Sequence, residues 1–328
     1  MSTPRVVTAL LLLAAALPAW GANQTPSMAS SFAAFWSVAQ GRPLTEQLQQ
    51  WDRYIEAPRR DVYASVVWDT QHHSDWALRK QRYLQARFAD YPSLAAGIPS
   101  EAASLQQALE QTIPRFGRLF SDASARPLVY EVLAPNFDAK SGVLADGTPV
   151  LAFAVDSLLL EKASLDIVVP HELFHLYHAQ HAGFSNDGVM SDVPLTIPLF
   201  EEGLATYVSS QLSSGHGDGD LLLQSDLGDI PASRLPEIAR RFLVDARFKA
   251  IDSQHPGAFK RWFNASATAY QRDLPNRTGY WVGLQLIRYL RKSYSLASIA
   301  SWTPQQADSE VMLALHQLSA TAEVSSPR

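Results

Sequence analysis

The sequence contains no cysteine, so it can form no disulfide, carry no thiol nucleophile and offer no lipoprotein attachment site. It also lacks any block of like charge, and its formal net charge is -5. This charge distribution gives no electrostatic footprint for nucleic acid or anionic lipid, and it favours small molecules, peptides or proteins as partners. There is no internal repeat and no low-complexity segment. The fold must therefore be stabilised by its hydrophobic core, with or without a bound metal.

Long apolar runs are scarce as well. Beyond the N-terminal region, no stretch approaches the roughly 20 apolar residues that a membrane span needs. The N-terminal region, MSTPRVVTALLLLAAALPAWGANQ, has a basic Arg5, then an uncharged apolar run, then small residues at Ala19, Gly21 and Ala22. This order is typical of a secretory signal peptide over residues 1–22. We therefore expect a periplasmic or secreted protein with no stable membrane insertion after signal removal.

The rest of the chain has the composition of a globular protein, with 47% hydrophobic and 18% charged residues. Residues 23–124 have apolar positions at helical spacing and predict a helical N-terminal lobe. Two later segments, 126–135 (RPLVYEVLAP) and 148–156 (TPVLAFAVD), are short and rich in β-branched and aromatic residues. They predict two strands, separated by turn residues that include Gly142 and Gly147. From residue 164 onward the helical pattern returns, so we expect a mostly helical α+β fold.

Two segments approach functional motifs without matching them. The glycine-rich segment 213–223 (SSGHGDGDLLL) lacks the twelve-residue pattern of a calcium-binding loop, so we expect a solvated turn. The segment 183–187 (GFSND) lacks the second glycine of the G-x-S-x-G motif, which argues against a serine hydrolase.

The densest group of metal-binding side chains is PHELFHLYHAQH, residues 170–181, which contains four histidines and one glutamate. Residues four apart on an α-helix are offset by about 40° and about 6 Å, so His171 and His175 can reach one ion. Glu172 lies about 100° round the helix, close enough to take a proton from a water on the ion without ligating it. This is the HExxH arrangement, in which the glutamate is the general base and a catalytic zinc keeps one position for water.

The third ligand has two candidate positions. His181 stands where metzincins place their third histidine, but His178 replaces the glycine that bends the chain in that pattern. On an unbroken helix, His181 would lie about 15 Å along the axis from the first histidine. The segment 198–208 (PLFEEGLATYV) predicts a second helix, and Glu201 or Glu202 on that helix could complete a site of two histidines and one carboxylate. The geometry therefore favours the second helix.

The sequence HELFH, followed by a helix bearing E-G-x-A-x-Y, resembles the gluzincin metallopeptidases. Over about residues 125–295 the chain also resembles a bacterial family of predicted zinc-dependent proteases of unassigned function. The segments that carry this resemblance are TPVLAFAVD, HELFH, EEGLATY and RTGYWVG. The resemblance implies a thermolysin-like zincin domain over residues 125–328, with a small mixed sheet. It also implies Zn²⁺ ligation by His171, His175 and Glu202.

The same resemblance implies roles around the ion. Tyr280, in RTGYWVG, would stabilise the tetrahedral oxyanion, with Arg277 as a weaker candidate and a core-packed tyrosine as the alternative. Thr206 would contact a ligating histidine or face the core. TPVLAFAVD resembles the edge strand along which such enzymes bind an extended substrate. His178 lies within about 20° of His171 on the helix, so we expect it to contact the cleft or to be an ordinary hydrogen-bonded histidine.

These observations predict an exported zinc metallopeptidase that hydrolyses peptide bonds in peptides or proteins, with Glu172 and Tyr280 as catalytic residues. The alternative is a non-catalytic exported binding protein with a structural or vestigial zinc site. The intact Glu172 favours the enzyme, because a structural zinc has no need of a base. Neither function involves nucleic acid.

Overall fold

The computed structural model describes residues 26–184, 192–250, 252, 254–255, 257–264 and 271–320. The predicted signal peptide at residues 1–22 lies outside the described residues, and so does most of the GFSND segment. Among the described helices, none combines the length and the apolar character that crossing a membrane requires.

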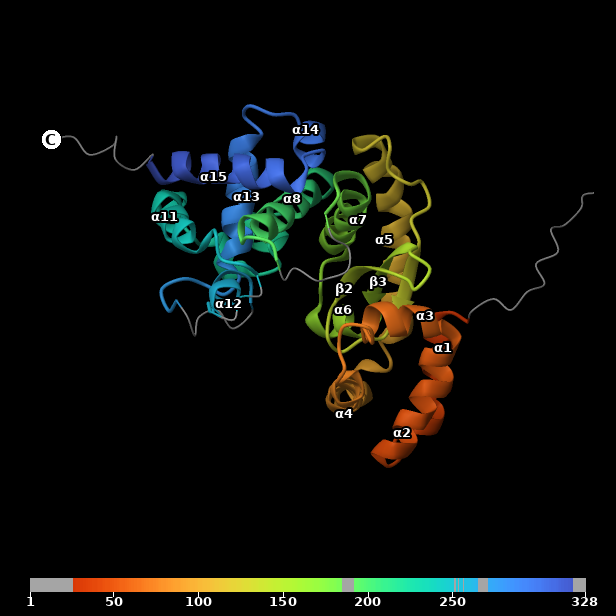
Figure 1. Ribbon diagram of the computed structural model, residues 1–328. Coiled ribbons are helices and arrows are strands. Elements are labelled where there is room, and N and C mark those ends of the chain that lie inside the picture. Colours follow the sequence, from red (N-terminus) through yellow and green to blue (C-terminus); the bar gives the residue numbers. More distant parts are fainter. Residues whose placement is uncertain are drawn as a thin grey trace, which may run out of the picture.

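Helices come first in the chain, then a small sheet, then helices to the end (Figure 1). The helices before the sheet are α1 (Met28–Ala39), α2 (Leu44–Trp51), η1 (Asp52–Glu56), η2 (Ala57–Arg59), α3 (Arg60–Val62), η3 (Tyr63–Val67), α4 (Trp76–Leu94) and α5 (Ile98–Leu119). The strands are β1 (Val129–Val132), β2 (Ala139–Val143) and β3 (Pro149–Ala154). The helices after the sheet are α6 (Val155–Glu161), α7 (Leu165–Ala182), α8 (Thr196–Leu212), α9 (Asp218–Leu221), α10 (Ser225–Gly228), η4 (Ala232–Arg234), α11 (Leu235–Asp245), α12 (Ala258–Phe263), α13 (Thr278–Leu290), α14 (Leu296–Ala300) and α15 (Pro304–Ala320). This order confirms the prediction of a mostly helical α+β fold.

The sheet is mixed, as expected, and its strand order is β1-β3-β2. β3 pairs in parallel with β1 and antiparallel with β2. The two predicted strands are therefore present, but the expectation that TPVLAFAVD is an edge strand is wrong. Residues 150–154 are completely buried, as in a strand that has a neighbour on each side and cover on both faces. The edge strand beside β3 is β2.

The sequence does not predict β2, because AKSGV has little β-branched character and Gly142 is typical of a turn. In the structure Gly142 lies within the strand, where a Cβ atom would come within 2.9 Å of a methyl group of Val66. The glycine therefore lets β2 pack closely against η3. The turn to β3 instead uses Gly147, whose φ of +87° suits glycine.

A buried polar network joins the N-terminal helices to the sheet. Asp156, at the start of α6, is completely buried and accepts hydrogen bonds from the Tyr91 hydroxyl at 3.1 Å and the Ala134 N–H at 2.9 Å. Arg87 donates to the Asp156 carbonyl at 3.1 Å and to the Ser157 hydroxyl at 3.0 Å. Because α4 supplies Tyr91 and Arg87, this network fixes the helical lobe against the end of β3.

Helices α7 and α8 pack against each other at the centre of the molecule (Figure 1). α7 also packs against α5 and the sheet, whereas α8 packs against α13 and α15. The predicted core face of α7 is buried, with Leu173, Leu176 and Tyr177 each less than a tenth exposed. The opposite face of α7 carries the HExxH residues, so the packing directs them toward α8 and β2.

Candidate metal centre

The N-terminal half of α7 is held in place by side chains of α8 and the residue that follows it. Pro170 has no N–H, so the Asp166 carbonyl one turn earlier lacks its usual helical donor. The Ser213 hydroxyl donates to that carbonyl, and the Ser209 hydroxyl donates to the Ile167 carbonyl at 3.0 Å. These bonds fix the turn of α7 that precedes His171 against α8.

The two histidines of HELFH lie side by side, as their spacing predicts. The rings of His171 and His175 have centroids 4.8 Å apart, and their Nε2 atoms are separated by 3.1 Å. Both side chains are mostly buried, with 16% and 17% of their surface exposed. One nitrogen of each ring therefore points to the same small space.

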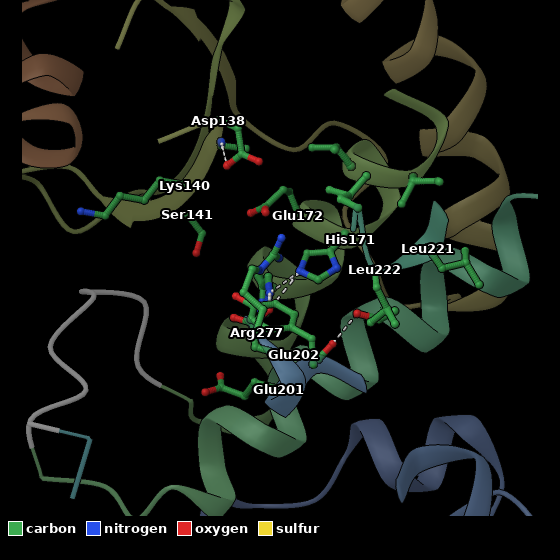
Figure 2. Close-up of a pocket in the computed structure, with 17 residues that line it drawn as sticks. Asp138, Lys140, Ser141, His171, Glu172, Glu201, Glu202, Leu221, Leu222 and Arg277 are labelled. Atoms are coloured by element: carbon green, nitrogen blue, oxygen red, sulfur yellow. Dashed lines mark hydrogen bonds and ion pairs between the residues drawn. The ribbon is translucent and has the colours of Figure 1, made fainter. Parts of the chain in front are cut away.

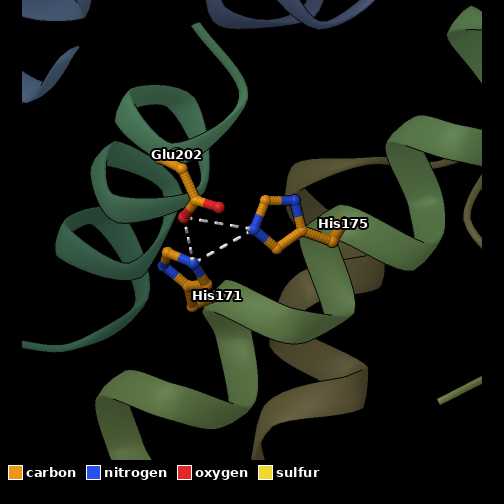
Figure 3. A group of neighbouring side chains, drawn as sticks. All are labelled: His171, His175 and Glu202. Atoms are coloured by element: carbon orange, nitrogen blue, oxygen red, sulfur yellow. Dashed lines mark hydrogen bonds and ion pairs between the residues drawn. The ribbon is translucent and has the colours of Figure 1, made fainter. Parts of the chain in front are cut away.

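Glu202 completes this group from the facing helix α8 (Figure 3). Its Oε2 atom lies 3.2 Å from Nε2 of His171 and 3.6 Å from Nε2 of His175. Among the described residues, these three side chains form the group of histidine and acidic groups that could hold a metal ion. The structure thus brings the three predicted ligands together.

The spacing of the three donor atoms fits a tetrahedral ion. Zinc binds nitrogen and oxygen ligands at about 2.0 to 2.1 Å, so two ligands of a tetrahedral site lie about 3.3 Å apart. The observed separations of 3.1, 3.2 and 3.6 Å surround that value. Two imidazoles and one carboxylate, with the fourth position left for another ligand, are also a donor set that catalytic zinc uses.

The charges of the group are mutually compensating. Burial opposes charge on His175, but the carboxylate of Glu202 outweighs it and raises the pKa of His175 to about 9. Burial also opposes charge on Glu202, yet His175 and the hydrogen bonds from both histidines hold the pKa of Glu202 below its usual value. Without a metal, protonated His175 and the Glu202 carboxylate therefore form an ion pair. A metal ion that binds there must displace this proton, so we expect metal binding to release protons.

The three side chains open on a cleft of about 310 Å³, here called the metal-side cleft. It is lined by Asp138, Ala139, Lys140, Ser141, Ile167, Val168, His171, Glu172, His175, Glu201, Glu202, Thr206, Leu221, Leu222, Leu223, Arg277 and Tyr280. Glu172 points into the space between α7 and β2 (Figure 2). Burial raises the pKa of Glu172, and the histidines His171 and His175 partly offset that effect. A carboxylate whose pKa lies closer to neutral can both accept and return a proton.

Two glycines bring α13 against the ligand helix α8. A Cβ atom on Gly203 would lie 2.4 Å from the backbone carbonyl carbon of Gly283, and one on Gly283 would lie 2.5 Å from the Leu199 carbonyl oxygen. The helices can approach this closely only because neither residue has a side chain. Gly203 directly follows Glu202, and Gly283 lies one turn after Tyr280. The glycines of EEGLATY and RTGYWVG thus place these two motifs together.

Tyr280 and Arg277 line the metal-side cleft from the start of α13. Burial raises the pKa of Tyr280, and Glu202 and Glu172 add to that effect while Arg277 opposes it. The tyrosine therefore keeps its proton and can donate a hydrogen bond. The Arg277 guanidinium lies over the Tyr280 ring, with its central carbon 4.2 Å from the ring centroid.

The rejected third-ligand candidates have other positions. Glu201 lines the cleft beside Glu202, but it does not belong to the three-residue group. Burial raises the pKa of Glu201 to about 7. His181 lies at the end of α7, where its Nδ1 atom is 2.8 Å from the Tyr177 carbonyl and its ring stacks on Tyr177.

Thr206 and His178 do not contact the three-residue group. The Thr206 side chain is 1% exposed and its hydroxyl donates to the Glu202 carbonyl at 2.8 Å, so of the two expectations the core-facing threonine is the one that holds. The expectation for His178 is wrong. His178 is 1% exposed and does not line the cleft. Its ring stacks between Phe174 and Phe184, and within the described part of the chain neither ring nitrogen has a hydrogen-bond partner. This apolar burial lowers the pKa of His178 to about 3, so the ring is neutral.

The sequence did not indicate two walls of the cleft. One is β2, with Ser141 and the preceding Asp138. The other is the second half of the segment 213–223. Its first half is a mostly exposed loop, as expected, but the second half forms α9 and buries Leu221 and Leu222. Arg288 of α13 binds both carboxylate oxygens of Asp218 at 2.6 Å and so holds Leu221 and its neighbours at the cleft. The adjacent leucines of DLLL were the available sign that this segment is packed.

Comparison of the chain with models of protein families, with curated proteins and with solved structures finds no match.

Proposed function

We propose that the protein is a zinc-dependent peptidase with a gluzincin-type site in a thermolysin-like domain. The observation that carries this proposal is the tetrahedral spacing of His171, His175 and Glu202 beside a partly buried carboxylate, Glu172, that is not one of the three grouped residues. A structural zinc site is normally closed by four protein ligands and needs no base. Three ligands on an open cleft, with a base beside them, favour catalysis over the binding-protein alternative.

The residues around the ion divide the chemistry of peptide hydrolysis among them. Zinc in such a site activates water at neutral pH and polarises a carbonyl group. Glu172 accepts the proton of the attacking water and returns it to the leaving amine. Tyr280, which is protonated and partly buried, donates a hydrogen bond to the oxyanion that develops on the substrate carbonyl.

The edge strand β2 offers a binding site for an extended peptide. The Ala154 N–H donates to the Asp138 carbonyl, and hydrogen-bonded pairs alternate along an antiparallel ladder. The backbone groups of Ala139 and Ser141 therefore point away from β3, to the free edge of β2. The Ala139 N–H is bound by Asp138, so the Ala139 carbonyl and the backbone groups of Ser141 are the ones that a substrate can use. A substrate can add to this edge as a further strand, with its scissile bond close to Glu172. The Lys140 side chain does not obstruct a substrate at this edge, because it points away from the cleft and donates to the Val66 carbonyl (Figure 2).

A cleavage assay tests this function. The protein should be prepared with excess zinc and incubated with a mixed peptide library, and the products identified by mass spectrometry. We expect one zinc per chain, and cleavage that stops when a chelator removes the metal and resumes when zinc is restored. Absence of bound zinc after such a preparation would refute the proposal.

We also propose that the protein is exported, with residues 1–22 removed as a signal peptide. Sequencing the N-terminus of the protein recovered outside the cytoplasm tests this directly. Recovery only from the cytoplasm, with Met1 retained, would show that export is wrong.

A further inference from the structure

A second hollow of about 470 Å³ adjoins the metal-side cleft. The two share four lining residues, Asp138, Ile167, Leu223 and Arg277. The second hollow extends from them to the C-terminal end of α6, to the loop before α9 and to α10. A peptide bound in the metal-side cleft could therefore extend residues next to its scissile bond into the second hollow. The four shared residues at the boundary would contact those substrate residues.

Arg277 is the cation at this boundary. It precedes the first residue of α13 and lines both spaces. Its guanidinium stacks over Tyr280, and no carboxylate of the described residues forms an ion pair with it. Stacking uses the face of the guanidinium, and a hydrogen bond to the Tyr280 hydroxyl uses part of its rim, so the other N–H donors remain for a ligand. Such a fork matches the two oxygens of a carboxylate.

The acidic residues of the second hollow do not neutralise Arg277. An Asp138 oxygen accepts the Ala139 N–H at 2.8 Å. An Asp220 oxygen accepts the Gly217 N–H at 3.1 Å and lies 3.9 Å from His216. Glu161 is exposed at the rim, where Arg277 interacts with it electrostatically but forms no close ion pair with it. The nearby acids are thus engaged with other partners or face solvent.

The backbone around the second hollow is strained. Four non-glycine residues in the described part of the chain have a positive φ, and three of them, Lys162, Leu223 and Arg277, line this hollow. A left-handed conformation costs such residues about 1 kcal/mol or more, and strain of this kind gathers at ligand sites. For Arg277, a φ of +59° fixes the direction in which the side chain leaves α13.

We propose that the second hollow is a substrate subsite for a carboxylate, which Arg277 binds through its free N–H donors. This inference rests on the proposed peptidase function and narrows its substrate class to peptides that carry a carboxylate near the scissile bond. The carboxylate is either the C-terminus of the peptide or an aspartate or glutamate side chain.

Peptide binding to a catalytically silent protein tests the subsite without relying on cleavage. The zinc-loaded Glu172→Gln protein is titrated, by calorimetry, with short alanine peptides of three kinds. One has a free C-terminus, one is amidated, and a third series is amidated with one alanine replaced by glutamate at each position in turn. The same titrations are made with Arg277→Gln, Arg277→Lys, Lys162→Gln and Arg272→Gln added to that background.

We expect at least one carboxylate peptide to bind about 10- to 100-fold more tightly than the neutral amidated peptide, as expected for charge-assisted hydrogen bonds. The free-terminus and internal-glutamate peptides show which source of carboxylate the site accepts. Arg277→Gln should abolish the preference, and Arg277→Lys should keep part of it. Arg272→Gln is the matched control, because Arg272 is exposed, lies in the same segment and lines neither space, so the preference should persist.

Three results would overturn the subsite. The first is equal binding of all peptides to the unsubstituted background. The second is a preference that survives in Arg277→Gln, and the third is one that disappears in Lys162→Gln alone. Zinc content and the urea midpoint of each variant show whether it has folded. Failure of wild type to cleave any peptide would refute the peptidase, whereas the binding comparison would still decide the subsite.

Discussion

The positions of Glu202 and His181 relative to the two HELFH histidines give opposite expectations for two substitutions. Glu202 places an oxygen within 3.6 Å of both imidazoles, whereas His181 binds the Tyr177 carbonyl at the end of α7. Glu202→Ala should therefore weaken zinc binding by more than about 100-fold. Loss of a residue that only hydrogen-bonds to a metal ligand already lowers metal affinity about 10- to 100-fold. His181→Ala should leave zinc affinity within a few-fold of wild type. Competition with a fluorescent chelator measures both affinities.

Glu201→Ala is the closest control for Glu202→Ala, because it removes the neighbouring carboxylate from the same helix and the same cleft. It should retain the metal, although activity can change with the charge of the cleft. A protein that loses zinc through His181→Ala and keeps it in Glu202→Ala would make the third ligand a histidine and our assignment wrong.

His178 gives a prediction of pH-dependent stability. Its folded pKa of about 3 lies below the unfolded value of about 6.5, so the unfolded state binds more protons between these values. Stability is therefore lost as the pH falls through 6.5. Between pH 7 and pH 5 the loss from this group is roughly 2 kcal/mol.

His178→Leu should remove that loss, because leucine has a similar volume and does not titrate. We expect the free energy of unfolding of the variant, relative to wild type, to rise by about 2 kcal/mol from pH 7 to pH 5. Urea titrations of the metal-free proteins measure the difference, since bound zinc would add its own pH dependence. Parallel pH profiles for the two proteins would mean that His178 is not held neutral among the phenylalanine rings.

The sequence predicts the position of a site residue well when that position depends on one helix alone, and poorly when it depends on how two helices pack. His171, Glu172 and His175 follow from the period of one helix, and the structure places them accordingly. The choice of Glu202 over Glu201 needed the packing of α8 on α7, which the sequence alone does not specify. The expectation for His178 was wrong because its surroundings include Phe200, which lies on another helix and 22 residues away in the sequence.

The crossing of α8 and α13 controls the distance between the proposed zinc ligand Glu202 and Tyr280. Gly203→Ala would place a methyl group 2.4 Å from the Gly283 backbone, so the helices must separate. We expect this to lower the free energy of unfolding by about 1 to 3 kcal/mol, as other overpacked contacts do. Urea denaturation gives the difference, and peptide cleavage should fall more than zinc affinity.

Gly117→Ala is the matched control. Gly117 lies inside α5, where a Cβ atom would meet nothing within 4 Å. This substitution should stabilise the protein by about 0.5 to 1 kcal/mol through helix propensity alone. If Gly203→Ala proved as stable as Gly117→Ala, the close contact of α8 and α13 could not exist.

The sequence predicts a helix or strand best where the element has a strong periodic pattern of apolar residues. α7, α8, β1 and β3 have strong apolar patterns and were recognised. β2 and α9 were not, because each owes its conformation to contacts with other parts of the chain. Gly142 of β2 packs on Val66, and Asp218 of α9 is bound by Arg288. β2 and α9 both form walls of the metal-side cleft. The sequence therefore predicts the three candidate metal ligands better than it predicts the walls of the cleft around them.

Across the whole molecule, the ion would join two groups of helices. α7 packs against α5 and the sheet, α8 packs against α13 and α15, and a zinc ion would bind both. Zinc at 100 times its Kd stabilises a folded protein by about 2.7 kcal/mol. We therefore expect removal of zinc to lower Tm by about 5 °C, measured by calorimetry.

The Glu202→Ala protein provides the control for this thermal shift. Because it lacks one ligand, its Tm should change little when the same concentration of zinc is added. An equal rise in wild type and Glu202→Ala would place the stabilising zinc elsewhere on the molecule.

If this chain hydrolyses peptides with a zinc site whose base is Glu172, zinc-loaded Glu172→Gln must cleave peptides more slowly than wild type. Zinc content must be measured in the same sample, and Glu110→Gln, on the exposed face of α5, is the control. We predict that Glu172→Gln keeps its zinc and cleaves peptides about 10² to 10⁴ times more slowly than wild type, while Glu110→Gln is unchanged. Cleavage by Glu172→Gln at the wild-type rate would show that Glu172 is not the base of a zinc peptidase site.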